Sequence, residues 1–156
     1  KAKMKSFKLY ISFLCLLCVL SCNTNQVFLH GFNENKWDYR DSVMFFFNID
    51  NTSSPYNLSL FFRNTLDYSY RNIYFFVEIS YGDNVFLYDT LQYSITNKYG
   101  QWLGGGMGYK KDNYFDFKEN VIFQNKGKYR FIIQHGMREN QLIGTSELGF
   151  KIQTND

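Results

Sequence analysis

The stretch that decides the fold is Val43-Met44-Phe45-Phe46-Phe47-Asn48-Ile49-Asp50, in which every odd position is apolar and the later even positions are polar. Successive side chains of a strand point to opposite faces of a sheet, so this pattern predicts a strand with one buried face. Turn-forming residues separate further alternating runs, which cover residues 57–65, 73–80, 85–95, 129–134 and 148–153. We therefore expect an all-β fold, an antiparallel β-sandwich of jelly-roll or Ig-like type with about seven to nine strands.

Three weaker segments accompany these runs. Residues 27–30 and 120–124 are candidates for short strands, and residues 138–143 are a candidate for a short helix. Alanine, the best helix former, occurs once among the 156 residues, whereas aromatic residues make up 21%. No internal repeat or composition shift marks a second domain, so a single domain is expected.

The N-terminus has the pattern of a bacterial lipoprotein signal. Four lysines lie before residues 9–20, which form an uncharged and mostly apolar run. This run is shorter than the roughly 20 residues that a helix needs to span a bilayer. Ser21 is the small residue that the signal protease needs before Cys22. We expect a signal peptide over residues 1–21, a lipidated tether over residues 22–26 that begins at Cys22, and one β-sandwich domain over residues 27–156. The alternatives are an ordinary secretory signal and a short anchor helix.

Removal of the signal changes what the charge implies. The full chain carries +3, but residues 1–21 hold four of the 17 basic residues and none of the 14 acidic ones, which leaves −1 on the rest. The remaining basic residues are scattered, so no nucleic-acid partner is expected. Cys15 and Cys18 leave with the signal, so the domain keeps no thiol for a disulfide, a metal cluster or a nucleophile.

The domain has little catalytic chemistry to offer. His30 and His135 are isolated and lack the spacing of zinc ligands, so both are expected to be structural. Two carboxylate pairs could serve a glycosidase only if a cleft held them, and nothing in the sequence provides one: Asp38 with Asp41, and Asp112 with Asp116. We expect no enzymatic activity, no cofactor, no metal and no small-molecule substrate.

A glycine-rich segment covers residues 100–108. It lacks the Gly-Lys-Ser/Thr of a phosphate loop, so Gly104, Gly106 and Gly108 are expected to form a turn or bulge where the backbone passes close to other groups. Because these three alternate, one face of a strand here would be bare and open to an aromatic ring.

Four aromatic residues fall opposite the expected core faces of neighbouring strands: Tyr74, Phe76, Phe86 and Tyr88. They either cover a second apolar layer or form a platform for a partner protein or a glycan, because exposed apolar patches usually mark interaction sites.

Several segments together resemble the gliding-motility lipoprotein H family (GldH), in the same order along nearly the whole domain. The resemblance starts with the signal that ends at Cys22. The segments that follow are Trp37-x-x-x-Asp41, Tyr70–Val77, Asp89–Leu91, Gly100–Gly108 with its Gln-Trp-Leu-Gly, and Gly127–Arg138, followed by Leu142, Gly144 and Gly149. Gly105 is an extra glycine relative to the family pattern, which leaves the geometry of that turn open.

The resemblance implies a lipid-anchored outer-membrane component of the gliding machinery, linked more loosely to type IX secretion, for which no enzymatic activity is established. Asn23 and the lack of an acidic cluster after Cys22 favour the periplasmic face. We expect Trp102, Arg138, Tyr74 and Tyr88 to contact other motility or secretion proteins of the envelope. Structural roles are expected for Gly104, Gly106, Gly108 and Tyr129. The alternative function is that of a glycan-binding β-sandwich lipoprotein of the cell envelope.

Overall fold

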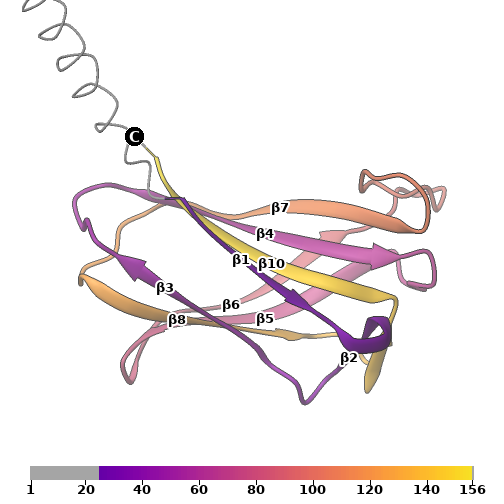
Figure 1. Cartoon of the computed structure of the whole chain (residues 1–156), viewed down its shortest axis with the longest axis horizontal. Helices are drawn as coiled ribbons and strands as arrows, with labels where there is room; N and C mark the ends of the chain where they lie inside the picture. Colours follow the sequence, from indigo (N-terminus) through magenta and orange to yellow (C-terminus); the bar gives the residue numbers. More distant parts are fainter. Residues whose placement is uncertain (1–24, 156) are drawn as a thin grey trace, which may run out of the picture.

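Two antiparallel sheets packed face to face make up the structure, a computed structural model that describes residues 25–155 (Figure 1). Sheet I contains, in spatial order, β1 (Gln26–Gly31), β10 (Thr145–Thr154), β4 (Tyr56–Thr65) and β7 (Lys110–Val121). Sheet II contains β3 (Val43–Ile49), β8 (Gly127–His135), β5 (Asn72–Tyr81) and β6 (Asn84–Ser94). A short ribbon pairs β2 (Lys36–Asp38) with β9 (Gln141–Ile143), and the 3-10 turn η1 (Asn33–Asn35) precedes it.

The eight long strands follow jelly-roll connectivity. Apart from the β5–β6 hairpin, each connection between successive long strands passes from one sheet to the other, and β1 pairs with the last strand, β10. This winding of two Greek keys is the jelly roll. The all-β sandwich expected from the sequence is therefore confirmed. The described residues form ten strands because the ribbon adds two of three residues each.

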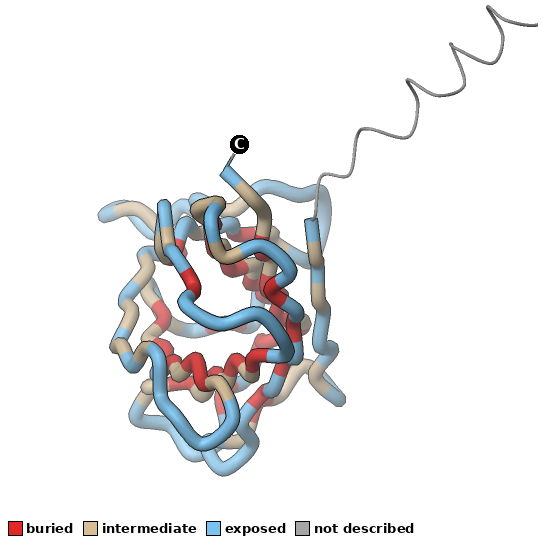
Figure 2. The backbone as a smooth tube through the Cα atoms, turned by 90° about the vertical axis from the view of Figure 1, so that its left-hand side faces the viewer, coloured by how far each residue is buried: buried red, intermediate tan, exposed pale blue. Residues whose placement is uncertain are grey.

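Alternation along the strands builds the core. In β3, Val43, Phe45, Phe47 and Ile49 are buried, and the residues between them are exposed. Figure 2 shows buried residues along the inner sides of both sheets. Phe131 of sheet II and Phe150 of sheet I meet at the centre, with ring centroids 4.5 Å apart. Burial of such rings on folding is the main stabilising contribution in a domain without disulfides.

Two local predictions are wrong. The expected helix over residues 138–143 is absent: residues 138–140 are irregular, and residues 141–143 form the strand β9, which pairs with β2. The expected strand over residues 120–124 is instead the end of β7 and the turn after it, where Phe123 is fully buried. β7 itself has no counterpart in the sequence predictions.

The sandwich has two distinct ends. β1 begins beside the end of β10, with Gln26 opposite Ile152, and the chain before β1 leads toward Cys22, which lies outside the described residues. We call this the tether end; its connections cover residues 50–55, 82–83 and 122–126. We call the other the distal end; its connections cover residues 32–42, 66–71, 95–109 and 136–144. Within the described range, no helix has the length and apolarity needed to cross a membrane.

Candidate docking surfaces

The distal end gathers parts of three segments that carry the family resemblance, while others, such as Asp89–Leu91, lie along the strands. The Trp37–Asp41 stretch, the glycine-rich segment around Trp102 and the Met137–Arg138 pair all lie on its connections, although they are far apart in sequence. Loops held by a rigid sandwich are the usual place for binding residues. The distal end is therefore the first candidate docking surface.

Trp37 organises the turn after β2. Its side chain is fully buried, and its Nε1 donates a hydrogen bond of 2.6 Å to the backbone oxygen of Asp41. Phe32 stacks on its ring at 4.7 Å, and His135 meets it edge-on at 5.2 Å. The Trp-x-x-x-Asp spacing thus places the backbone carbonyl of Asp41, not its carboxylate, at the indole N–H.

His135 is a buried histidine at this end. Its exposed fraction is 2%, and neither ring nitrogen has a hydrogen-bond partner among the side chains and backbone that the structure describes. Burial lowers its pKa and favours the neutral ring, although the backbone of Trp37 and, less strongly, the carboxylate of Asp38 act in the opposite direction. Within residues 25–155 no three His, Cys, Asp or Glu side chains cluster as a metal site requires.

The connection between β6 and β7 is long but well bonded. Thr96 pairs with Trp102, the backbone N–H of Leu103 donates to Ile95, and Gly105 exchanges two 2.9 Å hydrogen bonds with Asp112. Trp102 is partly buried and packs against the core. Its ring supports the loop from beneath as well as facing outward in part.

The glycines of this connection allow it to fold back on β7. A Cβ on Gly104 would lie 2.6 Å from Oδ1 of Asn113 and 2.8 Å from the backbone oxygen of Asp112. Gly106 and Gly108 have φ angles of 109° and 77°, which side-chain-bearing residues rarely adopt. A Cβ on Gly105 would meet nothing within 4 Å. There is therefore room for a side chain at position 105, and close packing does not explain the extra glycine.

Exposed apolar side chains cover the tips of the distal loops. Met107 is 99% exposed. The backbone N–H of Leu66 donates a hydrogen bond to the backbone oxygen of Tyr109, which joins the loop over residues 66–71 to the loop over residues 95–109. The large apolar residues exposed on these two loops are Leu66, Tyr99, Leu103, Met107 and Tyr109. Such a concentration is typical of a protein interaction site.

The predicted partner-binding residues occupy two neighbouring areas. Tyr74 lies half-buried on the outer face of sheet II, where its backbone oxygen accepts a hydrogen bond from the backbone N–H of Gly136. Arg138, two residues after Gly136 in the chain, is exposed. Tyr88 lies further toward the tether end of the same outer face, opposite Glu78, and is 68% exposed. Trp102 belongs to the distal loops. The three aromatic residues therefore do not form one flat platform.

Two other aromatic residues lie at the tether end. Tyr129 is buried, its ring centroid is 4.9 Å from that of Phe123, and its hydroxyl donates to the backbone oxygen of Asn125. Phe86, predicted to face outward, is 38% exposed, and its ring also stacks on that of buried Phe123 at 5.0 Å. A bulge between β5 and β6 shifts the register at this point, so Phe86 has no partner residue on β5.

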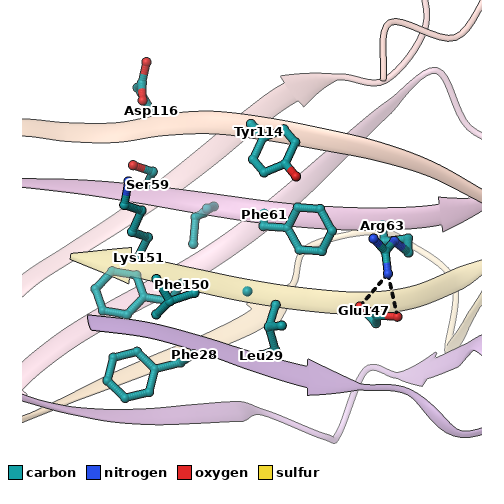
Figure 3. A pocket seen from close by; sticks show the side chains of 13 residues that line it. Phe28, Leu29, Ser59, Phe61, Arg63, Tyr114, Asp116, Glu147, Phe150 and Lys151 are labelled. Atoms are coloured by element: carbon teal, nitrogen blue, oxygen red, sulfur yellow. Dashed lines mark hydrogen bonds and ion pairs between the residues drawn. The ribbon is translucent and has the colours of Figure 1, made fainter. Parts of the chain in front are cut away.

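The outer face of sheet I is the second candidate surface, and no sequence pattern predicts it. Three rows of side chains cross its four strands, as the pairing register places them (Figure 3). The first row is Val27, Lys151, Ser59 and Asp116. The second is Leu29, Gly149, Phe61 and Tyr114. The third is Gly31, Glu147, Arg63 and Asp112. The hollow on this face has a volume of about 440 Å³.

Ion pairs fix the third row. Nε of Arg63 lies 2.6 Å from Asp112, and its Nη1 lies 2.9 Å from Glu147. The bond to Arg63 is the main reason that the pKa of Asp112 is lowered. Asp116 lies on the same face, two rows away, with Tyr114 between the carboxylates. Asp38 is likewise paired with Arg40 at 2.8 Å. Neither predicted carboxylate pair faces a shared cleft.

The comparisons with known proteins agree with the sequence resemblance. The chain is 34% identical to the gliding motility lipoprotein GldH homolog of Christiangramia forsetii, over 97% of this chain and 98% of that one. It is 29% identical to the gliding motility lipoprotein GldH of Flavobacterium johnsoniae, over 94% and 96%. A crystal structure of dimeric latent PorU from Porphyromonas gingivalis is similar over 85% of this chain and 13% of that chain, at 11% identity. Its TM-score of 0.34 supports no inference.

A family model described as GldH lipoprotein matches residues 28–152, which cover the whole sandwich except the outermost ends of β1 and β10. The chain therefore belongs to the GldH lipoprotein family.

Proposed function

We propose that this gliding-motility lipoprotein is a non-enzymatic docking module, held by a lipid on Cys22 at the periplasmic face of the outer membrane. One observation carries the proposal: the polarity of the sandwich. The chain enters the domain at the tether end, and the Trp37–Asp41 stretch, the glycine-rich segment around Trp102 and the Met137–Arg138 pair gather at the distal end. An anchored module with this polarity presents its loops away from its anchor.

The distal loops are the proposed contact with other envelope proteins of the motility machinery. Leu103 and Met107 expose 59% and 99% of their side chains, and Trp102 supports them from the core side. Arg138 and Tyr74 extend the surface onto sheet II, and Tyr88 continues it. Aromatic and arginine side chains beside apolar ones form the energetic centres of many interfaces.

The chemistry of the described residues supports a role without catalysis. Arg63 engages Asp112 and Glu147 in ion pairs, and Arg40 engages Asp38. His135 is neutral and enclosed. A general acid or base must reach a substrate, and these groups do not face one common cleft.

Deletion of the gene, followed by complementation, tests the proposed role. We expect deletion to abolish spreading, and to reduce type IX secretion if the link to that system is direct. Complementation with Cys22→Ala should leave the protein in the soluble fraction and fail to restore spreading. Normal gliding after deletion would contradict the function, and normal secretion alone would contradict only the secretion link.

A matched pair of variants tests the docking end. Leu103 at the distal end and Ile122 at the tether end are each 59% exposed. We expect Leu103→Ser to reduce the amount of partner recovered after crosslinking in native membranes and to slow spreading, whereas Ile122→Ser should change neither. The reverse pattern would assign docking to the tether end. Digestion of the domain by protease added to whole cells would contradict the periplasmic placement.

A further inference from the structure

The outer face of sheet I carries an exposed apolar row that the proposed docking end does not use. Val27 and Leu29 of the edge strand β1 are 62% and 63% exposed, and Tyr114 of the opposite edge strand β7 is 76% exposed. Phe61 lies between them and contacts the ring of Tyr114 at a centroid distance of 5.1 Å. Figure 3 shows Leu29, Phe61 and Tyr114 on this one face.

Gly149 creates the hollow at the middle of this row. A Cβ at this position would lie 2.8 Å from Cδ2 of Leu29 and 3.1 Å from Cβ of Phe61. The two larger side chains therefore lean over the bare backbone of β10. The result is a shallow, apolar depression bounded by Leu29 on one side and Tyr114 on the other.

The charged side chains of the third row are joined in ion pairs, whereas those of the first row are not. Arg63 in the third row is bonded to Asp112 and Glu147. Lys151 and Asp116 in the first row form no ion pair with any residue of the described part of the chain. Ser59 separates them, with Lys151 on one side and Asp116 on the other. The first row thus presents one free cation and one free anion toward the solvent.

The distance to the anchor limits what can cover this face. Gln26 is four residue steps after Cys22, and an extended chain spans at most about 3.6 Å per step, so the start of β1 lies within roughly 14 Å of the lipidated cysteine. The first row begins at Val27, the next residue. Leu29 follows about 7 Å further along the strand. The tether thus leads into sheet I, and the first row is the one nearest to the lipidated cysteine.

From this geometry, and resting on the proposed lipid anchor at Cys22, we infer that the outer face of sheet I lies on the phospholipid surface of the membrane. Lys151 reaches lipid phosphates and Asp116 reaches the ammonium of a zwitterionic headgroup. Leu29 and Phe61 enter the boundary between headgroups and acyl chains. Tyr114 places an amphipathic ring there, as tyrosine does at membrane interfaces.

Because the tether holds the domain at the bilayer, even a small apolar surface is enough to bind lipid. An apolar row of this size binds lipid weakly by itself, but the anchor holds it at a high effective concentration next to the bilayer. In this orientation the long axis of the sandwich lies along the membrane. The distal loops then point sideways, toward a partner at the membrane surface, and the outer face of sheet II faces the periplasm.

Site-directed fluorescence on the whole lipidated protein tests the orientation. Residues 25–155 contain no cysteine, so single cysteines can carry an environment-sensitive probe. Tyr114→Cys and Tyr88→Cys form a matched pair, because both are exposed tyrosines on edge strands of opposite sheets. Leu29→Cys and Met44→Cys form a second pair, with 63% and 54% exposure on β1 and β3.

The labelled proteins are reconstituted into vesicles of phosphatidylethanolamine and phosphatidylcholine that contain a lipid-borne quencher. We expect probes at positions 29 and 114 to be quenched several-fold more than probes at 44 and 88, and Lys151→Glu to weaken that quenching. Equal quenching of all four probes would overturn the inference. Protection from a water-soluble quencher without lipid quenching would do so too, because a protein or a second copy would then cover the face.

A control separates this inference from the proposed function. Cys22→Ala should release the protein from the vesicles. If the unaltered chain itself does not associate with the membrane, the anchor proposal fails. If it is anchored but probes on both sheets report water, only the orientation fails.

Discussion

The two ends of the sandwich are built differently. At the tether end, connections of two to six residues close over a cluster of rings in which Phe123 contacts Phe47, Tyr56, Phe86 and Tyr129 at centroid distances of 4.9–5.8 Å. At the distal end, connections of six to fifteen residues combine the rings of Phe32, Trp37 and His135 with individual hydrogen bonds and with glycines packed closely against β7. The difference teaches that ring packing dominates the tether end, while rings, hydrogen bonds and close backbone approach together shape the distal end.

The largest effect should come from the ring cluster. Phe123→Ala removes a fully buried ring from between Phe47 and Tyr129 and leaves a cavity. We expect the free energy of unfolding to fall by about 3–5 kcal/mol. Denaturant titration followed by tyrosine and tryptophan fluorescence measures it. A loss below about 1 kcal/mol, which is ordinary for a surface site, would mean that the ring cluster does not dominate the tether end.

The hydrogen bond of Trp37 comes next. Trp37→Phe keeps a buried ring but leaves the carbonyl of Asp41 without its donor, so we expect a loss of up to about 3 kcal/mol. Asp41→Asn is the control, because the acceptor is the backbone oxygen and remains in place. If Asp41→Asn destabilised the protein as much as Trp37→Phe, the carboxylate rather than the carbonyl would be the important group.

Adjacent glycines provide a sharper test of the distal backbone. Gly104→Ala forces a Cβ against the backbone oxygen of Asp112, and we expect a loss of about 1–2 kcal/mol. Gly105→Ala meets open space and should change the free energy of unfolding by less than about 0.5 kcal/mol. Thermal unfolding of the two variants side by side distinguishes them. Equal losses would show that chain flexibility, not close approach, explains the glycines.

The smallest effect is a dependence on pH. His135 is neutral when buried, so its pKa in the folded chain lies below the 6.5 of an exposed histidine. The stability that this burial allows is present above pH 6.5 and is lost as the pH falls from there toward the lowered pKa, with a slope of at most about 1.4 kcal/mol per pH unit. Unfolding curves between pH 7 and 5 measure it, and His135→Leu should flatten the slope.

His30→Gln is the control for that measurement, because His30 is exposed at the end of β1. We expect this variant to keep the slope of the unaltered chain. An unchanged slope in His135→Leu would show that His135 is not the titrating group. Carboxylates such as Asp112, whose pKa is lowered from 3.8, affect stability only below this pH range.

Much of the sandwich could be predicted because alternation is a local property. β3 alternates without interruption, so its buried face can be identified from seven residues. β7 escaped prediction for a physical reason. Asn113 points inward with the phenylalanines of this strand, and it is tolerated there because its amide donates to Phe62 and Asn64 of β4. A buried polar residue whose hydrogen-bond partners lie on another strand interrupts the alternation of apolar and polar residues by which a strand is predicted.

The surfaces could be predicted only in part. The Trp-Leu-Gly block was identified from the sequence, and the structure places it on the distal loops. The hollow on sheet I could not be found, because Leu29, Phe61 and Tyr114 become neighbours only through the pairing of four strands. Pairing register depends on the whole sheet, and no local period encodes it.

The pairing of β1 with β10 also has a mechanical consequence. All six residues of β1, from Gln26 to Gly31, pair with β10, and the strand runs from the tether end toward the distal end. A pull on the tether that is resisted at the distal loops acts along β1, across hydrogen bonds that lie perpendicular to it. The ladder is then loaded in shear, with its bonds sharing the force together rather than opening one after another. Under the proposed anchoring and docking, this geometry withstands a pull better than one in which the same edge strand is peeled from the sheet one bond at a time.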